Sequence, residues 1–276
     1  MDELPISEVP ERLIESVGHV LYDYSLGFVR IEDTPDGEDA VLVGSGTLIT
    51  LQNKYAVLTA HHVVKALPRK DRLGLILSSK LNATTVPVGG LHYLEIARGS
   101  VDSEGPDLGA VVLPSPIVGS LTAKKSFYNL DLRREQLLNR KPEINNGVWF
   151  VYGFVEEWTV EEKGVGGYER AKGFNALAGM GGVNSSYTVG NYDYFIFPVS
   201  YGGRSEAPRN FGGMSGGGLW QVTLEKDSHG ELTRQTPLLS GIVFYQGPIK
   251  ANQSTLSCHG RRSVYEVVYE ALKGAP

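Results

Sequence analysis

The chain has 276 residues, of which 41% are hydrophobic, and a formal net charge of −5. This length and apolar fraction exclude a largely disordered chain and allow one all-β domain or two half-barrels that share a cleft. No run of lysine or arginine is long enough to follow a phosphate backbone, so we expect neither nucleic acid nor a membrane as a partner. Residues 1–25 lack the basic start and apolar run of a signal peptide, and the single cysteine, Cys258, cannot form an internal disulfide. Both features favour a cytoplasmic location.

The residues predict a short helix followed by many strands. Apolar residues at helical spacing over 8–20 predict a packing helix. From residue 26 onward, short apolar runs separated by glycine, proline, asparagine and aspartate are typical of β-barrels. Glycine-rich residues 179–192 are expected to be a loop, and helical spacing returns at 131–139 and 262–273. We expect strands at 26–31, 41–50, 55–59, 73–78, 86–97, 108–113, 148–155, 193–199, 217–224 and 238–245.

Three short segments supply the residue types of a nucleophilic hydrolase. His62 follows an apolar strand in YAVLTAHHVV, Asp107 opens another in PDLGAVVLP, and Ser215 lies among glycines in FGGMSGGGLW. A serine hydroxyl becomes a strong nucleophile when an imidazole takes its proton, and that imidazole needs a carboxylate to fix its tautomer. The amides of Gly213 and Ser215 are the expected oxyanion donors, because a tetrahedral intermediate needs fixed N–H groups aimed at one point.

The order His, Asp, Ser and its local motifs resemble the chymotrypsin/trypsin-fold serine peptidases, of the bacterial stand-alone type without an attached PDZ module. The matching stretches are Thr59-Ala60-His61-His62, Asp107-Leu108-Gly109-Ala110 and Gly213-Met214-Ser215-Gly216-Gly217. The resemblance covers about residues 26–247 and selects His62, the fourth residue of its motif, over His61.

This resemblance implies an all-β fold of two six-stranded antiparallel β-barrels with a short N-terminal helix and a C-terminal helix. The expected divisions are an extension at 1–25, a first barrel at 26–130, a linker with a short helix at 131–146, and a second barrel with the closing helix at 147–276. His62 and Asp107 would belong to the first barrel and Ser215 to the second.

The implied activity is that of an endopeptidase that cuts protein or peptide substrates through an acyl-enzyme. Ser215 would attack, His62 would act as base and then acid, and Asp107 would orient the histidine. No cofactor or metal is expected, because histidine and cysteine do not cluster at ligand spacing. Met214 stands where zymogen-activated members have an aspartate, so the site would be either constitutively formed or ordered by an activating partner protein.

Candidate specificity residues precede Ser215 and follow it on a later strand. Arg209 matches the base of the family's specificity pocket, which suggests cleavage after Asp or Glu; the alternative is an Arg209 turned to solvent or paired with Glu206. Phe244, Tyr245 and Gln246 would contact the substrate, and Gln246 would narrow the pocket. Phe244 stands where most members have a serine that binds the catalytic aspartate, so another donor would have to replace that serine.

Two other interpretations remain open at this point. Ser215, Asp227 and His259 are in the order of an α/β-hydrolase esterase, although three glycines after the serine are a poor start for the helix that this fold requires. The chain would alternatively be a catalytically silent β-barrel that binds partners through its cleft.

Overall fold

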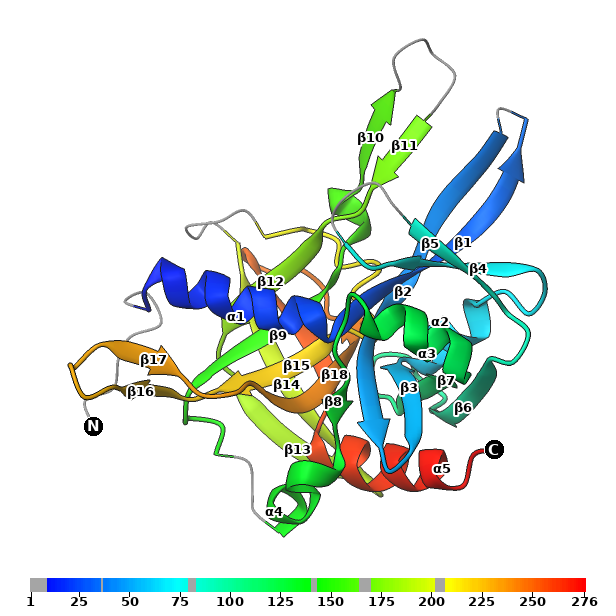
Figure 1. Ribbon diagram of the computed structural model, residues 1–276. Coiled ribbons are helices and arrows are strands. Elements are labelled where there is room, and N and C mark those ends of the chain that lie inside the picture. Colours follow the sequence, from blue (N-terminus) through cyan, green and yellow to red (C-terminus); the bar gives the residue numbers. More distant parts are fainter. Residues whose placement is uncertain (1–8, 36, 79–82, 140–142, 164–169, 202–206) are drawn as a thin grey trace.

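The computed structural model describes residues 9–35, 37–78, 83–139, 143–163, 170–201 and 207–276. Two large sheets built almost wholly from antiparallel pairs make up the body of the protein (Figure 1). The first sheet has eight strands in the order β5-β4-β1-β2-β3-β7-β6, with β8 added in parallel to β2. Its members are β1 (Ser25–Thr34), β2 (Gly37–Leu51), β3 (Lys54–Thr59), β4 (Arg72–Ile76), β5 (Ala83–Pro87), β6 (His92–Arg98), β7 (Asp107–Val112) and β8 (Tyr128–Asn129).

The second sheet has seven strands in the order β12-β9-β15-β18-β19-β14-β13. Two small hairpins, β10–β11 and β16–β17, extend from the body. The strands of the second sheet are β9 (Val148–Phe154), β12 (Ala176–Gly181), β13 (Ser185–Val189), β14 (Tyr192–Ser200), β15 (Gly218–Val222), β18 (Leu238–Gln246) and β19 (Gln253–His259). The hairpin strands are β10 (Val160–Lys163), β11 (Arg170–Gly173), β16 (Leu224–Lys226) and β17 (Leu232–Arg234).

The expected all-β class is confirmed, but the sheets are larger than two sets of six strands. The run predicted at 86–97 divides into β5 and β6 at Gly89-Gly90, where Gly90 has a φ of +86° that suits glycine in a turn. The stretch 179–192 is not a loop: it contains the end of β12, all of β13 and the start of β14. Glycine is accommodated in β12 because the ring of Phe197 lies against Gly181, where a side chain would collide with it.

Helices precede the first strand, follow the last strand and interrupt the strands between them along the chain. The three predicted helices at 8–20, 131–139 and 262–273 are confirmed, with the last one beginning as a π-helical turn. The helical elements are α1 (Glu11–Asp23), α2 (His61–Ala66), α3 (Ser115–Thr122), η2 (Asp131–Arg133), α4 (Arg134–Asn139), η3 (Glu156–Trp158), η4 (Ser263–Val268) and α5 (Tyr269–Lys273). In the part of the chain that the structure describes, no helix has the length and apolar character needed to cross a membrane.

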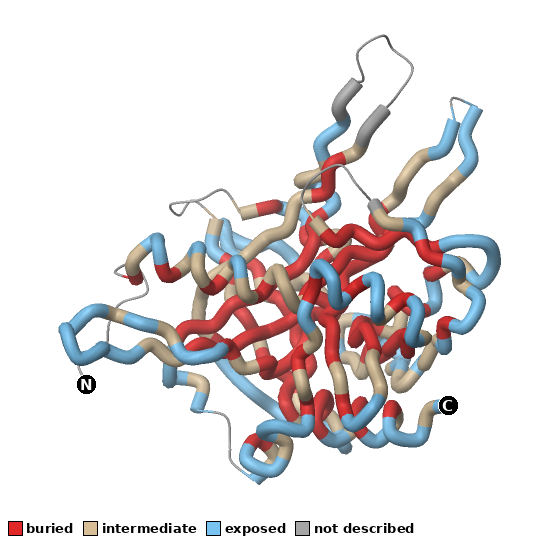
Figure 2. The backbone as a smooth tube through the Cα atoms, viewed as in Figure 1, coloured by how far each residue is buried: buried red, intermediate tan, exposed pale blue. Residues whose placement is uncertain are grey.

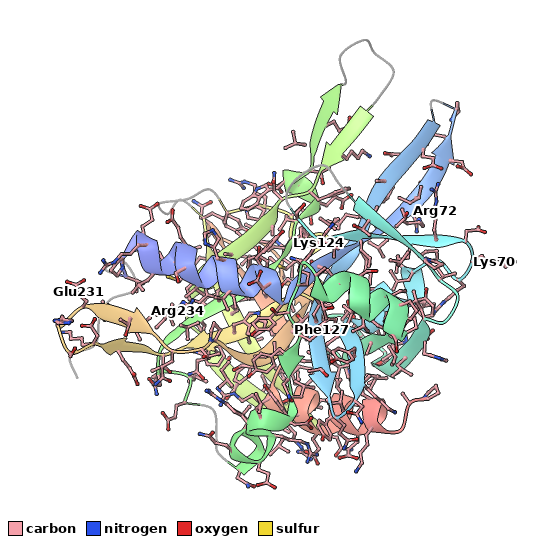
Figure 3. All side chains as sticks on the ribbon, in the orientation of Figure 1. Lys70, Arg72, Lys124, Phe127, Glu231 and Arg234 are labelled. Carbon is pink, nitrogen blue, oxygen red and sulfur yellow. The ribbon has the colours of Figure 1, made fainter. Side chains whose placement is uncertain are left out.

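Helix α1 is held against the second sheet by an apolar face and by polar contacts. Leu13, Val17 and Leu21 recur every four residues and are buried in a cluster that contains residues of β9 and β15. Arg234 Nε of β17 donates to Ser16 Oγ of the helix at 3.0 Å. Figure 3 shows Arg234 on the β16–β17 hairpin, which lies beside the helix. The predicted packing role of this helix is therefore confirmed.

The buried residues form a nearly continuous body across both sheets, whereas the tip of the β16–β17 hairpin is exposed (Figure 2). One cluster joins Leu58 and Leu108 of the first sheet with Phe150 and Trp220 of the second. Such shared packing holds the facing edges of the two sheets in one position relative to each other. The residues of the candidate site project from these edges.

Candidate active site

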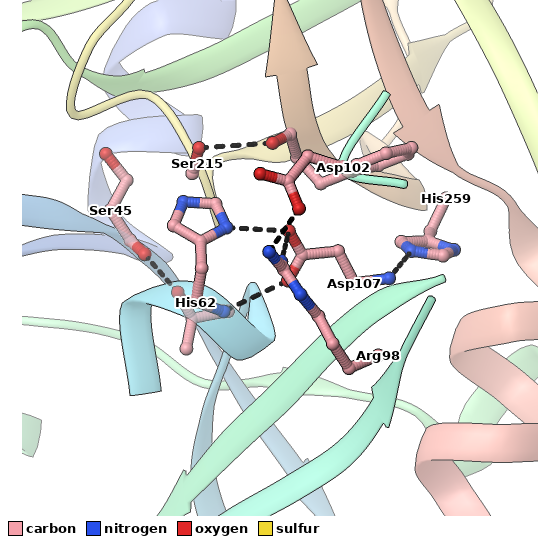
Figure 4. A network of polar contacts seen from close by, with 9 residues as sticks. Ser45, His62, Arg98, Asp102, Asp107, Ser215 and His259 are labelled. Carbon is pink, nitrogen blue, oxygen red and sulfur yellow. Dashed lines mark hydrogen bonds and ion pairs between the residues drawn. The ribbon is translucent and has the colours of Figure 1, made fainter. Parts of the chain in front are cut away.

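Strand pairing brings His62 and Asp107 together. His62 lies in the first turn of α2, directly after β3, and Asp107 is the first residue of β7, which pairs with β3. Nδ1 of His62 lies 2.7 Å from Oδ2 of Asp107, and the backbone N–H of His62 donates to Oδ1 at 3.0 Å (Figure 4). The aspartate is 2% exposed and the imidazole 40%, so a buried carboxylate orients a histidine that solvent and ligands can reach.

His61, the neighbouring candidate, faces a different carboxylate. Its Nε2 lies 3.2 Å from Oε2 of Glu95 on β6. The structure therefore brings His62, and not His61, to Asp107.

Arg98 supplies an additional partner for the aspartate. It lies directly opposite Asp107 in the β6–β7 register, and its Nη1 is 2.8 Å from the same Oδ2 that contacts His62. Its other guanidinium nitrogen pairs with the exposed Asp102. Burial alone would raise the pKa of the Asp107 carboxyl, but hydrogen bonds from His62 and the positive charge of Arg98 outweigh burial and hold that pKa below its usual value. Arg98 thus supplies the hydrogen-bond donor to Asp107 that the residue at position 244, a phenylalanine in place of a serine, does not supply.

His259 fixes the backbone on the other side of Asp107. Its Nε2 accepts a hydrogen bond from the Asp107 N–H at 2.9 Å, so the ring is neutral with its proton on Nδ1. The side chain is fully buried beside Tyr194 and Phe244, and this burial lowers the pKa of His259 to about 3 against a smaller opposing effect of Asp107. Sequence reasoning assigned this histidine to an esterase triad and missed its contact with Asp107.

The loop around Ser215 requires glycine at two positions. Gly213 and Gly216 have φ values of +86° and +89°, in the region that L side chains avoid. A Cβ on Gly216 would lie 2.1 Å from both the carbonyl oxygen of Ser45 and Oγ1 of Thr59. This close approach places the loop against the residues that immediately precede α2 and His62.

Ser45 of β2 anchors the same loop from the first sheet. Its Oγ donates to the Gly213 carbonyl at 2.7 Å and accepts from the Phe154 N–H at 2.8 Å. Its backbone N–H donates to the Ser215 carbonyl at 2.8 Å. A residue that the sequence did not single out therefore connects β2, β9 and the serine loop, and no local motif marks it.

Two amides of the loop are available for an oxyanion. The carbonyl of Gly212 accepts a hydrogen bond from the Glu156 N–H at 2.8 Å. Because the carbonyl and N–H of a trans peptide point in opposite directions, this contact turns the Gly213 N–H away from Glu156. Among the described residues, none accepts a hydrogen bond from the N–H of Gly213 or Ser215. Unpaired amides of this kind suit a developing negative charge.

The Ser215 hydroxyl is in a resting orientation. Its Oγ donates to the Phe244 carbonyl in a long contact of 3.4 Å, which Figure 4 marks beside the His62 ring. Within the described residues, no hydrogen bond joins this hydroxyl to His62. Contacts between nucleophile and base are often loose without substrate, so a rotation of the serine side chain would complete the arrangement.

Arg209 belongs to the segment that precedes Ser215, and Gln246 contacts that segment. Arg209 is exposed, and its guanidinium carbon lies 5.8 Å from the centre of the Tyr201 ring; Glu206, its alternative partner, lies outside the described residues. The Gln246 side chain donates to the Arg209 carbonyl at 2.8 Å and accepts from the Phe211 N–H at 2.9 Å. Gln246 thus holds the segment before the serine, and the exposed arginine is not desolvated.

The side chain of Phe244 points into the core. The ring is 3% exposed and packs between Tyr194 and His259. The substrate contact expected at Phe244 stays a prediction, and it would have to come from the backbone of this residue. The next residue, Tyr245, is half-buried.

The esterase alternative is wrong. The sheets are antiparallel and the described chain lacks the alternating strands and helices of an α/β-hydrolase. Asp227 caps the β16–β17 turn, where its Oδ1 accepts from the N–H groups of His229 and Glu231. The described residues also contain no group of three or more His, Cys, Asp or Glu placed to hold a metal ion.

Comparison with known proteins adds information on the fold. No protein-family model and no curated protein matches the sequence. Among solved structures, an HtrA-type protease, AlgW, determined with a decapeptide, is 13% identical with a TM-score of 0.50, over 96% of this chain and 68% of that one. A structure concerning the Sesbania mosaic virus VPg protein is 14% identical with a TM-score of 0.43, over 88% of this chain and 89% of that one. This similarity is too low to support a conclusion about the fold. The chain therefore has the chymotrypsin-like fold that trypsin-like proteases share.

Proposed function

We propose that the protein is a serine endopeptidase that hydrolyses peptide bonds through an acyl-enzyme. Ser215 attacks the carbonyl carbon while His62 takes the hydroxyl proton, and the histidine then gives that proton to the leaving amine. Asp107 holds the imidazole in the required tautomer. The amides of Gly213 and Ser215 bind the oxyanion in both tetrahedral intermediates.

The observation that carries this proposal is the His62–Asp107 pair beside the serine loop. The 2.7 Å contact between Nδ1 and Oδ2 leaves Nε2 as the free basic atom on the exposed side of the ring. Carboxyls whose pKa is shifted by specific partners, as that of Asp107 is, gather at functional sites, and the two unpaired amides lie in the same loop as the nucleophile. The chymotrypsin-like fold adds support, because trypsin-like proteases use this combination.

The resting Ser215 hydroxyl favours regulation by a partner as part of the same proposal. Binding of a substrate or an activating protein would have to turn Oγ from the Phe244 carbonyl toward His62. The cytoplasmic location and the preference for Asp or Glu stay predictions, and the exposed Arg209 removes the desolvation argument for that preference.

Fluorophosphonate labelling of the purified full chain tests the proposal. We expect covalent modification of Ser215, mapped by peptide mass spectrometry, and loss of labelling in Ser215→Ala and His62→Ala. Ser120→Ala is the matched serine control, because Ser120 is exposed on α3, and His229→Ala is the control for histidine. Circular dichroism of each variant shows whether the fold is intact.

Three results distinguish the alternatives. Labelling of Ser215 that depends on His62 supports the peptidase, and cleavage of a denatured casein substrate by the same sample extends it to peptide bonds. Labelling that persists in His62→Ala contradicts the assigned base. A folded wild-type protein that neither labels nor cleaves, alone or with cell extract added as a source of activator, would instead be a silent binding module.

A further inference from the structure

A cleft of about 440 Å³ lies next to the loop that leads into Asp107. One wall comes from the β6–β7 loop and the other from the β13–β14 hairpin, so the cleft spans the two sheets. The lining side chains that matter here are Glu104, Pro106, Tyr187, Val189, Tyr192 and Tyr194. This cleft contains none of the residues assigned to catalysis above.

Three tyrosines give the cleft an aromatic wall. The rings of Tyr187 and Tyr194 stack with centres 5.0 Å apart and an angle of 19° between their planes. Tyr194 is almost fully buried and packs edge-on against Phe244, so its ring is held in place from behind. Tyr187 is 41% exposed and Val189 is also exposed, which leaves apolar surface open at the mouth.

The opposite wall carries a carboxylate with no basic partner. Glu104 is exposed, and none of the described residues forms an ion pair or hydrogen bond with its side chain. Its charge acts on Tyr187, because burial and then the Glu104 carboxylate raise the pKa of the Tyr187 phenol. The carboxylate and the aromatic wall therefore face the same space.

The loop that carries Glu104 is fitted closely to the tyrosines. Gly105 has a φ of +69°, and a Cβ at this residue would lie 2.9 Å from the Tyr194 ring. Only glycine allows the backbone to approach the ring so closely while Glu104 stays at the rim. The two walls are thus built against each other.

We propose that this cleft binds the ammonium or guanidinium group of a lysine or arginine side chain in the polypeptide substrate. The exposed Tyr187 ring, backed by the buried Tyr194 ring stacked on it, offers an electron-rich face to a cation, and the Glu104 carboxylate adds a charge that an anionic or neutral side chain cannot use. The inference rests on the proposed peptidase function. Glu104 is three residues from Asp107, a chain distance of at most about 11 Å, so the basic residue would lie a few positions away from the bond that is cut.

Binding is measured without turnover in the Ser215→Ala protein. The probes are two blocked heptapeptides of alanine, one with a central lysine and one with norleucine, which has a similar chain and no charge. Isothermal titration should give a dissociation constant about tenfold lower for the lysine peptide. Adding Glu104→Gln or Tyr187→Leu should remove most of that difference, whereas Glu135→Gln, an exposed glutamate on α4, should preserve it.

Cleavage by the enzyme with its native Ser215 locates the site along the substrate. Products from a proteome-derived peptide library should show lysine or arginine enriched at one fixed position away from the scissile bond, and Glu104→Gln should abolish that enrichment. Equal affinity for the two heptapeptides overturns the proposal. A lysine preference that survives both Glu104→Gln and Tyr187→Leu overturns it as well, because the cation then binds elsewhere.

The two proposals fail in different ways. Efficient cleavage without any basic preference leaves the peptidase intact and removes the cation pocket. A lysine preference that depends on Glu104 in a protein that cuts nothing supports the pocket and contradicts the peptidase.

Discussion

Replacing Arg98 with glutamine should lower the stability of the protein at neutral pH and have a smaller effect in acid. Burial raises the pKa of the Asp107 carboxyl, whereas the hydrogen bonds of His62 and the charge of Arg98, 2.8 Å away, lower it below its usual value. A carboxyl with a lower pKa in the folded than in the unfolded chain stabilises the fold above its unfolded pKa, and this stabilisation is lost as the pH falls through the folded value. Removing Arg98 therefore weakens a stabilisation that exists only while Asp107 is ionised.

The size of the effect follows from the geometry. A hydrogen bond to a charged partner contributes about 1.5–3 kcal/mol. Asp107 is 2% exposed, but Arg98 is 33% exposed and is also paired with Asp102, so solvent screening lowers the expected value. The free energy of unfolding of Arg98→Gln should therefore be lower than that of the wild type by about 1 kcal/mol at neutral pH.

The assay is urea unfolding of the wild type and of Arg98→Gln at a series of pH values from about 7 down to about 3. The difference between the two proteins should be largest at neutral pH and should shrink toward the acid end of the series. Arg30→Gln, which removes an exposed arginine from β1, is the control. Asp102→Asn, which removes the exposed partner of Arg98, should change the free energy of unfolding less than Arg98→Gln does.

An unchanged free energy of unfolding at neutral pH in a folded Arg98→Gln protein would falsify this account. A loss of the same size at every pH would contradict it equally, since it would mean that Arg98 acts independently of the charge on Asp107.

Three further substitutions test the supports of the site. The pKa of His259 is about 3 in the folded protein, so between about pH 6 and pH 4 the unfolded chain binds a proton that the folded chain does not. In urea unfolding, the free energy of unfolding of the wild type should therefore fall by about 1.4 kcal/mol for each pH unit of acidification in this range. His259→Gln should lack this slope. Ser45→Ala leaves the Gly213 carbonyl and the Phe154 N–H unpaired, so the free energy of unfolding should fall by about 1–3 kcal/mol. Fluorophosphonate labelling of Ser215 should also slow. An unchanged unfolding free energy together with an unchanged labelling rate would contradict the anchoring role of Ser45. Gly216→Ala should abolish fluorophosphonate labelling, because its Cβ meets backbone at 2.1 Å; normal labelling rates would refute the tight fit.

The core of the candidate site could be predicted because each part carries a local signal. His62 follows an apolar strand, Asp107 opens one, and Ser215 lies among glycines whose positive φ values the loop requires. Motifs of this kind can be recognised in the sequence because residues adjacent along the chain determine the local backbone geometry.

Arg98 and His259 had no such signal. The strand predicted over 86–97 ended before Arg98, and a register shift between Glu95 and Ala97 directs the following side chains toward Asp107. His259 ends β19, whose polar sequence QSTLSCH does not read as a buried strand. Its burial comes from pairing with β14 on one side and β18 on the other, which only the tertiary structure provides.

The contacts of Ser45 make the serine loop dependent on both halves of the protein. Ser215 belongs to the half that contains the second sheet, yet the atoms that hold its own carbonyl and that of Gly213 come from a strand of the first. A sliding movement of one sheet over the other by about an ångström is enough to break hydrogen bonds of this length. Under the proposed function, a small molecule that displaced one sheet relative to the other would therefore slow the reaction of Ser215 without occupying the substrate's site.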